Sequence, residues 1–167
     1  MGLTGEFLRH VLVCTAVLHA SGSPPSYSVT LQAPTAPVRA GSEVRVRATT
    51  TNTFDHEIRF AKGFGEEEFD FEIEVRDEKG QVPPLTQPYS ELKEHPASRR
   101  GSYSTYVLEP GKSFDTDLVV TKLYKITQPG KYTVTVTRGQ RPMWQLLGND
   151  REKNSVKSNT IAITVTQ

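Results

Sequence analysis

Apolar and polar side chains alternate with a period of two along most of this chain, and that period is typical of β-strands. In Phe69–Arg76 every second residue is Phe, Ile or Val, and the residues between them are charged. A register shift of one residue would bury four charges, so the apolar face is predicted to point inward. Tyr132–Arg138 repeats the pattern, with threonines between Tyr132, Val134 and Val136.

Eight segments carry such a pattern and are predicted to be strands. They are Tyr27–Ala33, Glu43–Asn52, His56–Ala61, Phe69–Arg76, Ser104–Leu108, Ser113–Thr121, Tyr132–Arg138 and Ser155–Thr166. No segment sustains the 3.6-residue period of a helix. Lys122–Ile126 has room for a single helical turn, and residues 83–103 are expected to form a connection without regular structure.

Glycines, often next to proline, mark the predicted turns between these strands. Pro110-Gly111 and Pro129-Gly130 each combine a fixed φ with a residue that tolerates positive φ, as a type II turn requires. Gly41-Ser42 and the segment 77–80 are further predicted turns. Short strands separated by tight turns favour two antiparallel sheets packed face to face.

We therefore predict an all-β fold: a two-sheet antiparallel immunoglobulin-like sandwich of seven to nine strands, spanning residues 29–167. Tyr132 opens a late strand directly after a Pro-Gly turn. It thus stands where the tyrosine-corner residue of such folds stands, with its hydroxyl bonded to a nearby backbone group. An ordinary core tyrosine is the alternative.

The N-terminal residues predict export. Val11–Ala20 is a short apolar run preceded by Arg9 and followed by small residues, which is typical of a secretory signal peptide. We assign residues 1–22 to the signal peptide and 23–28 to a flexible leader. A retained anchor is the alternative, but a spanning helix needs about 20 apolar residues. The protein is expected to be secreted or periplasmic, with no stable membrane anchor after cleavage.

Composition narrows the possible chemistry. The single cysteine, Cys14, lies in the predicted signal peptide, so the mature chain has no disulfide, thiolate nucleophile or zinc thiolate. The formal net charge of the full chain is +1, which gives no electrostatic reason to expect binding to nucleic acid or to a charged membrane surface.

Three stretches resemble a known group of domains. They are LEPGKSF at 108–114, LYKITQPGKYTVTV at 123–136 and VKSNTIAITV at 156–165. They resemble the immunoglobulin-like and fibronectin-type-III-like modules of secreted bacterial proteins. They are also similar to the small β-sandwich that precedes the catalytic domain of deuterolysin-like metallopeptidases. Bacterial proteinase-inhibitor sandwiches are similar as well. The resemblance covers the C-terminal half and implies a sandwich fold more than any activity.

No catalytic or metal-binding constellation stands out in the sequence. His56-Glu57 begins a string like the zinc motif His-Glu-x-x-His, but Phe60 occupies the position of the second histidine. After cleavage only His56 and His95 would remain, without a nucleophile elbow or a phosphate loop. We therefore expect a non-enzymatic protein with no metal site and no cofactor.

The acidic segment 66–78 contains eight carboxylates and one cation, Arg76. Clustered oxygens can hold Ca²⁺, but the spacing matches no calcium loop. We favour a solvated outer face, with Asp70, Glu72 and Glu74 pointing outward, or an edge protected against sheet pairing. Asp115 and Asp117 are likewise expected to point outward.

The segment from Gly139 to Asn154 is the candidate recognition loop, because it joins the last two strands and contains the only tryptophan. Its candidate binding residues are Arg141, Met143, Trp144, Leu146, Leu147 and Arg151. An apolar centre with basic margins, to which Arg138 also belongs, is typical of protein interfaces. Alternatively, Trp144 and Leu147 fold back and plug the end of the core.

Two functions follow from these observations. The first is a binding module of the cell envelope or exterior that contacts a protein or glycan through the candidate recognition loop. The second is a secreted proteinase inhibitor of the β-sandwich type, which needs a rigid exposed loop that enters a protease cleft. The sequence does not indicate the partner.

Overall fold

The structure is a computed structural model of the 167-residue chain, and it describes residues 25–63, 67–95, 103–139 and 155–167. Its elements, in chain order, are β1 (Tyr27–Gln32), β2 (Val38–Arg39), β3 (Arg45–Asn52), β4 (Ile58–Gly63), the 3₁₀ helix η1 (Glu67–Asp70), β5 (Phe71–Asp77), α1 (Gln87–Glu94), β6 (Tyr103–Leu108), β7 (Ser113–Val119), the 3₁₀ helix η3 (Val120–Lys122), β8 (Gly130–Gly139), β9 (Ser155–Lys157) and β10 (Ile161–Thr166).

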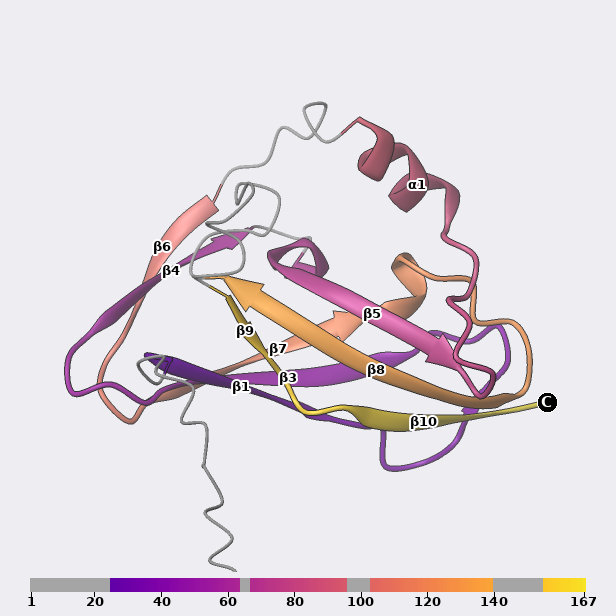
Figure 1. Cartoon of the computed structure of the whole chain (residues 1–167), viewed down its shortest axis with the longest axis horizontal. Helices are drawn as coiled ribbons and strands as arrows, with labels where there is room; N and C mark the ends of the chain where they lie inside the picture. Colours follow the sequence, from indigo (N-terminus) through magenta and orange to yellow (C-terminus); the bar gives the residue numbers. More distant parts are fainter. Residues whose placement is uncertain (1–24, 64–66, 96–102, 140–154) are drawn as a thin grey trace, which may run out of the picture.

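The strands form two layers, which Figure 1 shows with α1 outside them. The first sheet has the order β1-β3-β7, and the second has the order β2-β10-β8-β5 with β9 also paired to β8. A further pair, β4-β6, continues the β3 and β7 ribbons beyond a bend. The pairs are antiparallel except for the two-residue contact between β2 and β10. The predicted all-β, two-sheet antiparallel sandwich is confirmed. The described residues form ten strands rather than the predicted seven to nine, because the short β2 was not predicted and the last predicted strand is divided.

The core lies between the two sheets and is built from the predicted apolar faces. The buried side chains are those of Tyr27, Val29, Leu31, Val44, Val46, Ala48, Ile58, Phe60, Phe71, Ile73, Val75, Leu108, Leu118, Tyr132, Val134, Val136, Ile163 and Val165. Their alternation fixes the strand registers, because a slip of one residue would exchange them with charged neighbours. Burial of these side chains is the main source of the stability of the sandwich.

Two predictions about strand ends are confirmed: the type II turn at Pro110-Gly111 and the tyrosine corner at Tyr132. The Lys112 amide donates to the Glu109 carbonyl oxygen at 3.1 Å, and Gly111 has φ 70°, as a type II turn requires. The Tyr132 hydroxyl donates to the Gln128 carbonyl oxygen at 2.8 Å, four residues upstream. This hydrogen bond is that of a tyrosine corner. Gly130 differs from the prediction, since its φ of 148° is far from the type II value and it begins β8.

Four local predictions were wrong. Residues 83–103 were expected to lack regular structure, but they contain α1. Only one residue of this helix, Tyr89, is buried, so the sequence shows no repeat of apolar residues with a helical period. The predicted strand Ser155–Thr166 is divided into β9 and β10. The helical turn expected from Lys122 is η3, which begins two residues earlier. The strand expected from Phe69 begins at Phe71, because η1 precedes it.

Asn52 holds the bend between the two ribbons. Its buried side-chain amide donates to the carbonyl oxygens of His56 and Leu108, both at 2.8 Å, and its Oδ1 accepts from the Phe54 amide at 2.8 Å. These bonds satisfy backbone groups that lose their ladder partners where β3 ends. One polar side chain therefore sets the direction in which the β4-β6 pair leaves the sandwich.

Candidate functional site

Several connections leave the sandwich at one end, which we call the loop end. It is marked by Gly63 paired with Tyr103 and by Gly139 paired with Ser155. In Figure 1 these strand ends lie on the same side of the molecule. Loops gathered at one end of a sandwich are its usual binding surface.

The candidate recognition loop starts and finishes at the loop end, at Gly139 and Ser155. Its predicted binding residues Arg141, Met143, Trp144, Leu146, Leu147 and Arg151 lie outside the described residues. Their role in binding stays a prediction, and so does the alternative that Trp144 and Leu147 plug the core.

Arg138 lies directly beneath the loop end and is buried, with 1% of its surface exposed. The period that places Tyr132 inward also places Arg138 inward, six residues later on β8. Its guanidinium carbon lies 5.2, 4.6 and 4.9 Å from the ring centroids of Phe60, Phe71 and Phe114. These are cation–π distances. Arg138 was predicted to be part of a basic loop margin, and that prediction was wrong.

The electrostatics of Arg138 follow from this burial. Loss of hydration lowers its pKa to about 10, while the negative charge of Asp70 acts in the opposite direction. Asp70 is itself only 2% exposed, so both charges lie in the protein interior. The Tyr27 hydroxyl donates to the Arg138 carbonyl oxygen at 2.7 Å, and burial raises the pKa of Tyr27. Arg138 therefore remains a cation at neutral pH.

Glu68 supplies a second buried carboxylate on η1. It is 2% exposed, accepts a hydrogen bond from the Val119 amide at 3.2 Å and pairs with Lys122 Nζ at 3.0 Å. Glu68 and Asp70 are buried, contrary to the expected solvated outer face, whereas Glu72 is exposed and Glu74 is partly exposed, as expected. The tight turn of η1 interrupts the alternation of β5, so acidic side chains just before Phe71 turn inward.

The β4-β6 ribbon differs from the rest of the sandwich in its exposed apolar side chains. Tyr106 and Val107 on β6 are 41% and 44% exposed, and Phe54, at the entrance to β4, is 39% exposed. Among the described residues, Val82 is the one other large apolar side chain that is exposed. Tyr106 and Val107 are consecutive, so one lies on each face of the ribbon, and Phe54 lies in the turn before β4.

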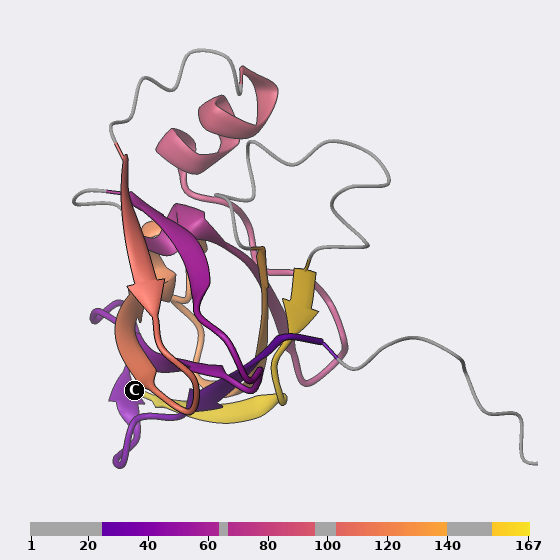
Figure 2. The ribbon, with the colours of Figure 1, turned by 90° about the vertical axis from the view of Figure 1, so that its left-hand side faces the viewer.

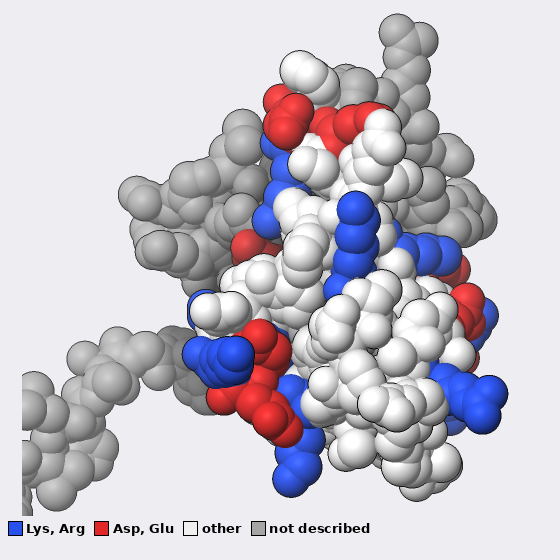
Figure 3. Space-filling view, turned by 90° about the vertical axis from the view of Figure 1, so that its right-hand side faces the viewer, with Lys and Arg blue, Asp and Glu red and all other residues white. Residues whose placement is uncertain are grey.

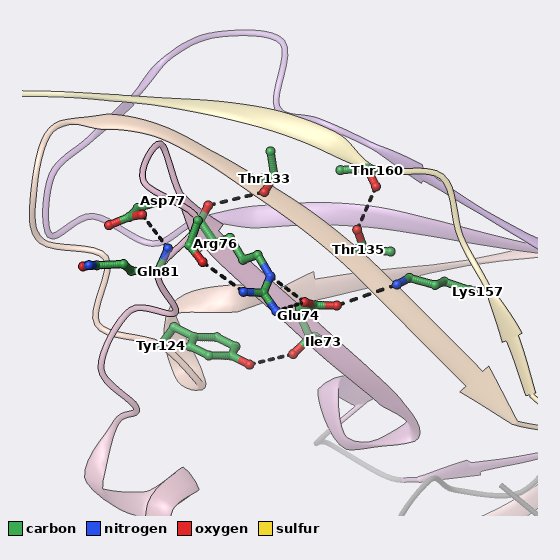
Figure 4. A network of polar contacts seen from close by, with 11 residues as sticks. Ile73, Glu74, Arg76, Asp77, Gln81, Tyr124, Thr133, Thr135, Lys157 and Thr160 are labelled. Atoms are coloured by element: carbon green, nitrogen blue, oxygen red, sulfur yellow. Dashed lines mark hydrogen bonds and ion pairs between the residues drawn. The ribbon is translucent and has the colours of Figure 1, made fainter. Parts of the chain in front are cut away.

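A cleft of about 390 Å³ lies on the outer face of the second sheet, partly under α1. Its lining residues are Glu72, Ile73, Glu74, Val82, Tyr89, Lys93, Tyr124, Thr135, Thr137 and Lys157. The Tyr124 hydroxyl donates to the Ile73 carbonyl oxygen at 2.7 Å, and burial raises the pKa of Tyr124 to about 12 (Figure 4). That hydrogen bond satisfies a backbone group on the open edge of β5.

Glu74 is the centre of the polar network in this cleft (Figure 4). The Arg76 guanidinium lies 2.6 Å from its carboxylate, Lys157 Nζ lies 3.7 Å away, and the hydrogen bond from Arg76 lowers the pKa of Glu74. The carboxylate is therefore a structural ion-pair partner, and the cleft supplies no paired nucleophile and base among the residues described.

The remaining candidates are ordinary surface groups. His56 is exposed, and its Nδ1 lies 2.9 Å from an Asp55 carboxylate oxygen. Asp115 and Asp117 point outward as predicted, and Asp117 pairs with Arg47 at 3.1 Å. The described part of the chain contains no group of three or more His, Cys, Asp or Glu that could hold a metal ion.

The face in Figure 3 carries acidic and basic side chains in small separate groups around uncharged surface. None of the helices in the described ranges is long and apolar enough to cross a membrane.

Comparison with known proteins gives structural likenesses but no family. No family model matches the chain, and no curated protein matches it. Among solved structures, the ASH / PapD-like domain 7 of human CEP192 is similar, with 13% sequence identity over 94% of each chain and a TM-score of 0.35. A TM-score this low carries no argument, so the assignment rests on the strands, their pairing and the tyrosine corner. These define an all-β, immunoglobulin-like sandwich domain.

Proposed function

We propose that this chain is a non-enzymatic binding module that contacts a protein through its loop end and the adjoining β4-β6 ribbon. The observation that carries the proposal is the exposure of Tyr106 and Val107 on that ribbon and of Phe54 in the turn that precedes it. Exposed aromatic side chains such as Phe54 and Tyr106 are enriched at protein interfaces.

The buried base beneath the loop end supports this proposal. Arg138 is enclosed by three phenylalanine rings, and the Gly139 that follows it begins the candidate recognition loop. Binding residues are commonly carried on loops that a rigid scaffold positions. The cleft under α1 has no such buried arginine among its described residues, and its ion pair between Arg76 and Glu74 is exposed.

A capture experiment tests the proposal. The full chain, immobilised and exposed to the extracellular and envelope fractions of its source cells, is expected to retain one specific protein. Trp144→Ala and Phe54→Ala are expected to lose that protein, whereas the control Val82→Ala, at an exposed site away from the ribbon, is expected to keep it. Equal capture by all four proteins, or a failure of any to capture a protein, would contradict the proposal.

We further propose that the module acts outside the cytoplasm, as the apolar run Val11–Ala20 suggests. N-terminal sequencing of the protein recovered from an exporting host is expected to begin close to Ser23. Recovery in the cytoplasm with Met1 intact would refute this location without affecting the binding proposal.

A further inference from the structure

Three edge strands of the sandwich are capped by a side chain from elsewhere in the fold. On β1, Asn159 accepts from the Leu31 amide at 2.7 Å and donates to the Leu31 carbonyl oxygen at 3.2 Å. On β7, the Glu68 carboxylate accepts a hydrogen bond from the Val119 amide. On β5, the Tyr124 hydroxyl donates a hydrogen bond to the Ile73 carbonyl oxygen. Such caps occupy backbone groups that would otherwise pair with another chain.

The outer edge of β6 has no comparable cap among the described residues. β6 pairs with β4 on one side, and residues 104–107 form no hydrogen bond to any other described element. Figure 2 shows β6 along one side of the molecule, outside β4. The strand Tyr103–Leu108 also contains no charged residue, proline or glycine. It therefore lacks the features that keep an edge strand from pairing.

We infer that β6 pairs antiparallel with β6 of a second copy of this chain, so that two β4-β6 ribbons join into one four-stranded sheet. The inference deepens the proposed function and rests on it, because it uses the same ribbon and names one partner. A second copy fits because an uncharged strand meets itself without like-charge repulsion. A two-fold contact is also the commonest symmetry of soluble oligomers.

The backbone pattern restricts the register of this pair. In an antiparallel pair, two directly opposed residues point their backbone groups either both toward the partner strand or both away from it. Neighbouring residues alternate in this respect, so a residue cannot oppose its own neighbour in the second copy. The two-fold axis must therefore pass through a position where one residue opposes the same residue of the second copy. With Thr105 on the axis, residues of β6 from both copies overlap along most of the strand, and Ser104 faces Tyr106 of the second copy. Thr–Thr pairs of this kind stabilise antiparallel strands.

Replacement of Thr105 by a charged residue tests the inference directly. Thr105 is exposed, so its replacement should leave the fold intact. The full chain, kept under reducing conditions, is expected to change from monomer to dimer with rising concentration in sedimentation velocity. Thr105→Glu and Thr105→Lys, each alone, are expected to stay monomeric, because like charges would face each other across the axis. An equal mixture of the two variants is expected to form a heterodimer.

Thr164→Glu, at an exposed position of β10, is the matched control and is expected to dimerise like the unaltered chain. The inference is overturned if the unaltered chain stays monomeric throughout, or if Thr105→Glu dimerises equally well. Partner capture through Trp144 is scored in a separate experiment, so a monomeric chain that still captures its partner would reject only the second copy.

A covalent readout checks the register. In a Cys14→Ser background the chain has no other thiol, so Thr105→Cys is expected to form a disulfide-linked dimer under mild oxidation. Thr164→Cys, the control, is expected to remain largely unlinked. Equal linking of both variants would contradict the register.

Discussion

Two groups of charged side chains lie on or next to β5 and β8, and they differ chiefly in burial. At the loop end, Arg138 and Asp70 are 1% and 2% exposed. On the outer face, the side chains of Glu74 and Arg76 are 41% and 51% exposed. Each group contains an arginine and a carboxylate, yet Arg138 is enclosed by aromatic rings whereas Arg76 is exposed to solvent. The comparison shows that the identity of two charged residues does not set their energetic weight.

Burial changes what each pair costs and contributes. A buried charge has lost its hydration, so removal of its partner leaves an uncompensated charge in the interior. An exposed charge keeps its hydration, and its partner is replaced by water and salt. We therefore expect the stability of the loop end to depend on the negative charge of Asp70, and the stability of the cleft to depend little on its exposed ion pairs. A rigid loop end and a tolerant outer face follow from this difference.

The largest effect is expected at Asp70. Asp70→Ala should lower the free energy of unfolding by about 3 to 5 kcal/mol, because it leaves Arg138 buried without its counter-charge. The double variant Asp70→Ala with Arg138→Met should recover much of this loss, since no buried charge remains. Urea unfolding of both single variants and the double variant measures the coupling.

Asp115→Ala, which removes an exposed carboxylate of β7, serves as the control and should change stability by less than about 0.5 kcal/mol. Additive losses in the double variant would mean that Asp70 and Arg138 are not coupled, and the proposed base of the loop end would then be wrong.

A smaller effect is expected at Tyr124 and has a defined pH range. Burial raises the pKa of Tyr124 from 10.0 to about 12, so the folded state favours the neutral phenol. The contribution to stability is complete below pH 10 and is lost as the pH rises through about 12. Tyr27 and Tyr132, whose pKa values are also raised, act in the same direction. Arg138 acts in the opposite direction, because its pKa is lowered.

Tyr124→Phe isolates this contribution. At pH 7 the variant should lose about 1 kcal/mol, since the hydrogen bond to the Ile73 carbonyl is removed. Above pH 10 its melting temperature should fall less steeply than that of the unaltered chain. An equal fall of the melting temperature with pH in both proteins would show that the pKa of Tyr124 is not raised in the folded state.

The alternation of side chains was sufficient to predict the strands and their inward faces, because each strand buries one face and a register slip is costly. It was not sufficient for Glu68 and Asp70, because they lie in η1, where a 3₁₀ helix with three residues per turn replaces the two-residue period of a strand. Arg138 lies on the inward face that Tyr132 and Val136 predict. Its burial could still not be predicted, since it depends on rings from distant strands and on Asp70.

The candidate site was predictable only in its position. The sequence indicated that the connection after β8 leaves one end of the sandwich, and Gly139 and Ser155 lie there. The exposed ribbon was not foreseen, because the sequence of β6 resembles that of any paired strand. Whether an edge is capped depends on distant residues such as Asn159 and Tyr124. Such long-range contacts have no local signature.

The smallest effect is expected at Glu74, and it completes the comparison. Glu74→Gln should change the free energy of unfolding by less than about 0.5 kcal/mol, because the carboxylate is partly hydrated and Arg76 keeps a hydrogen bond to the Gly80 carbonyl oxygen at 2.9 Å. High salt should abolish even this difference, as it screens exposed ion pairs. Urea unfolding at low and high salt measures both effects. A loss as large as that of Asp70→Ala would mean that burial does not distinguish the two pairs.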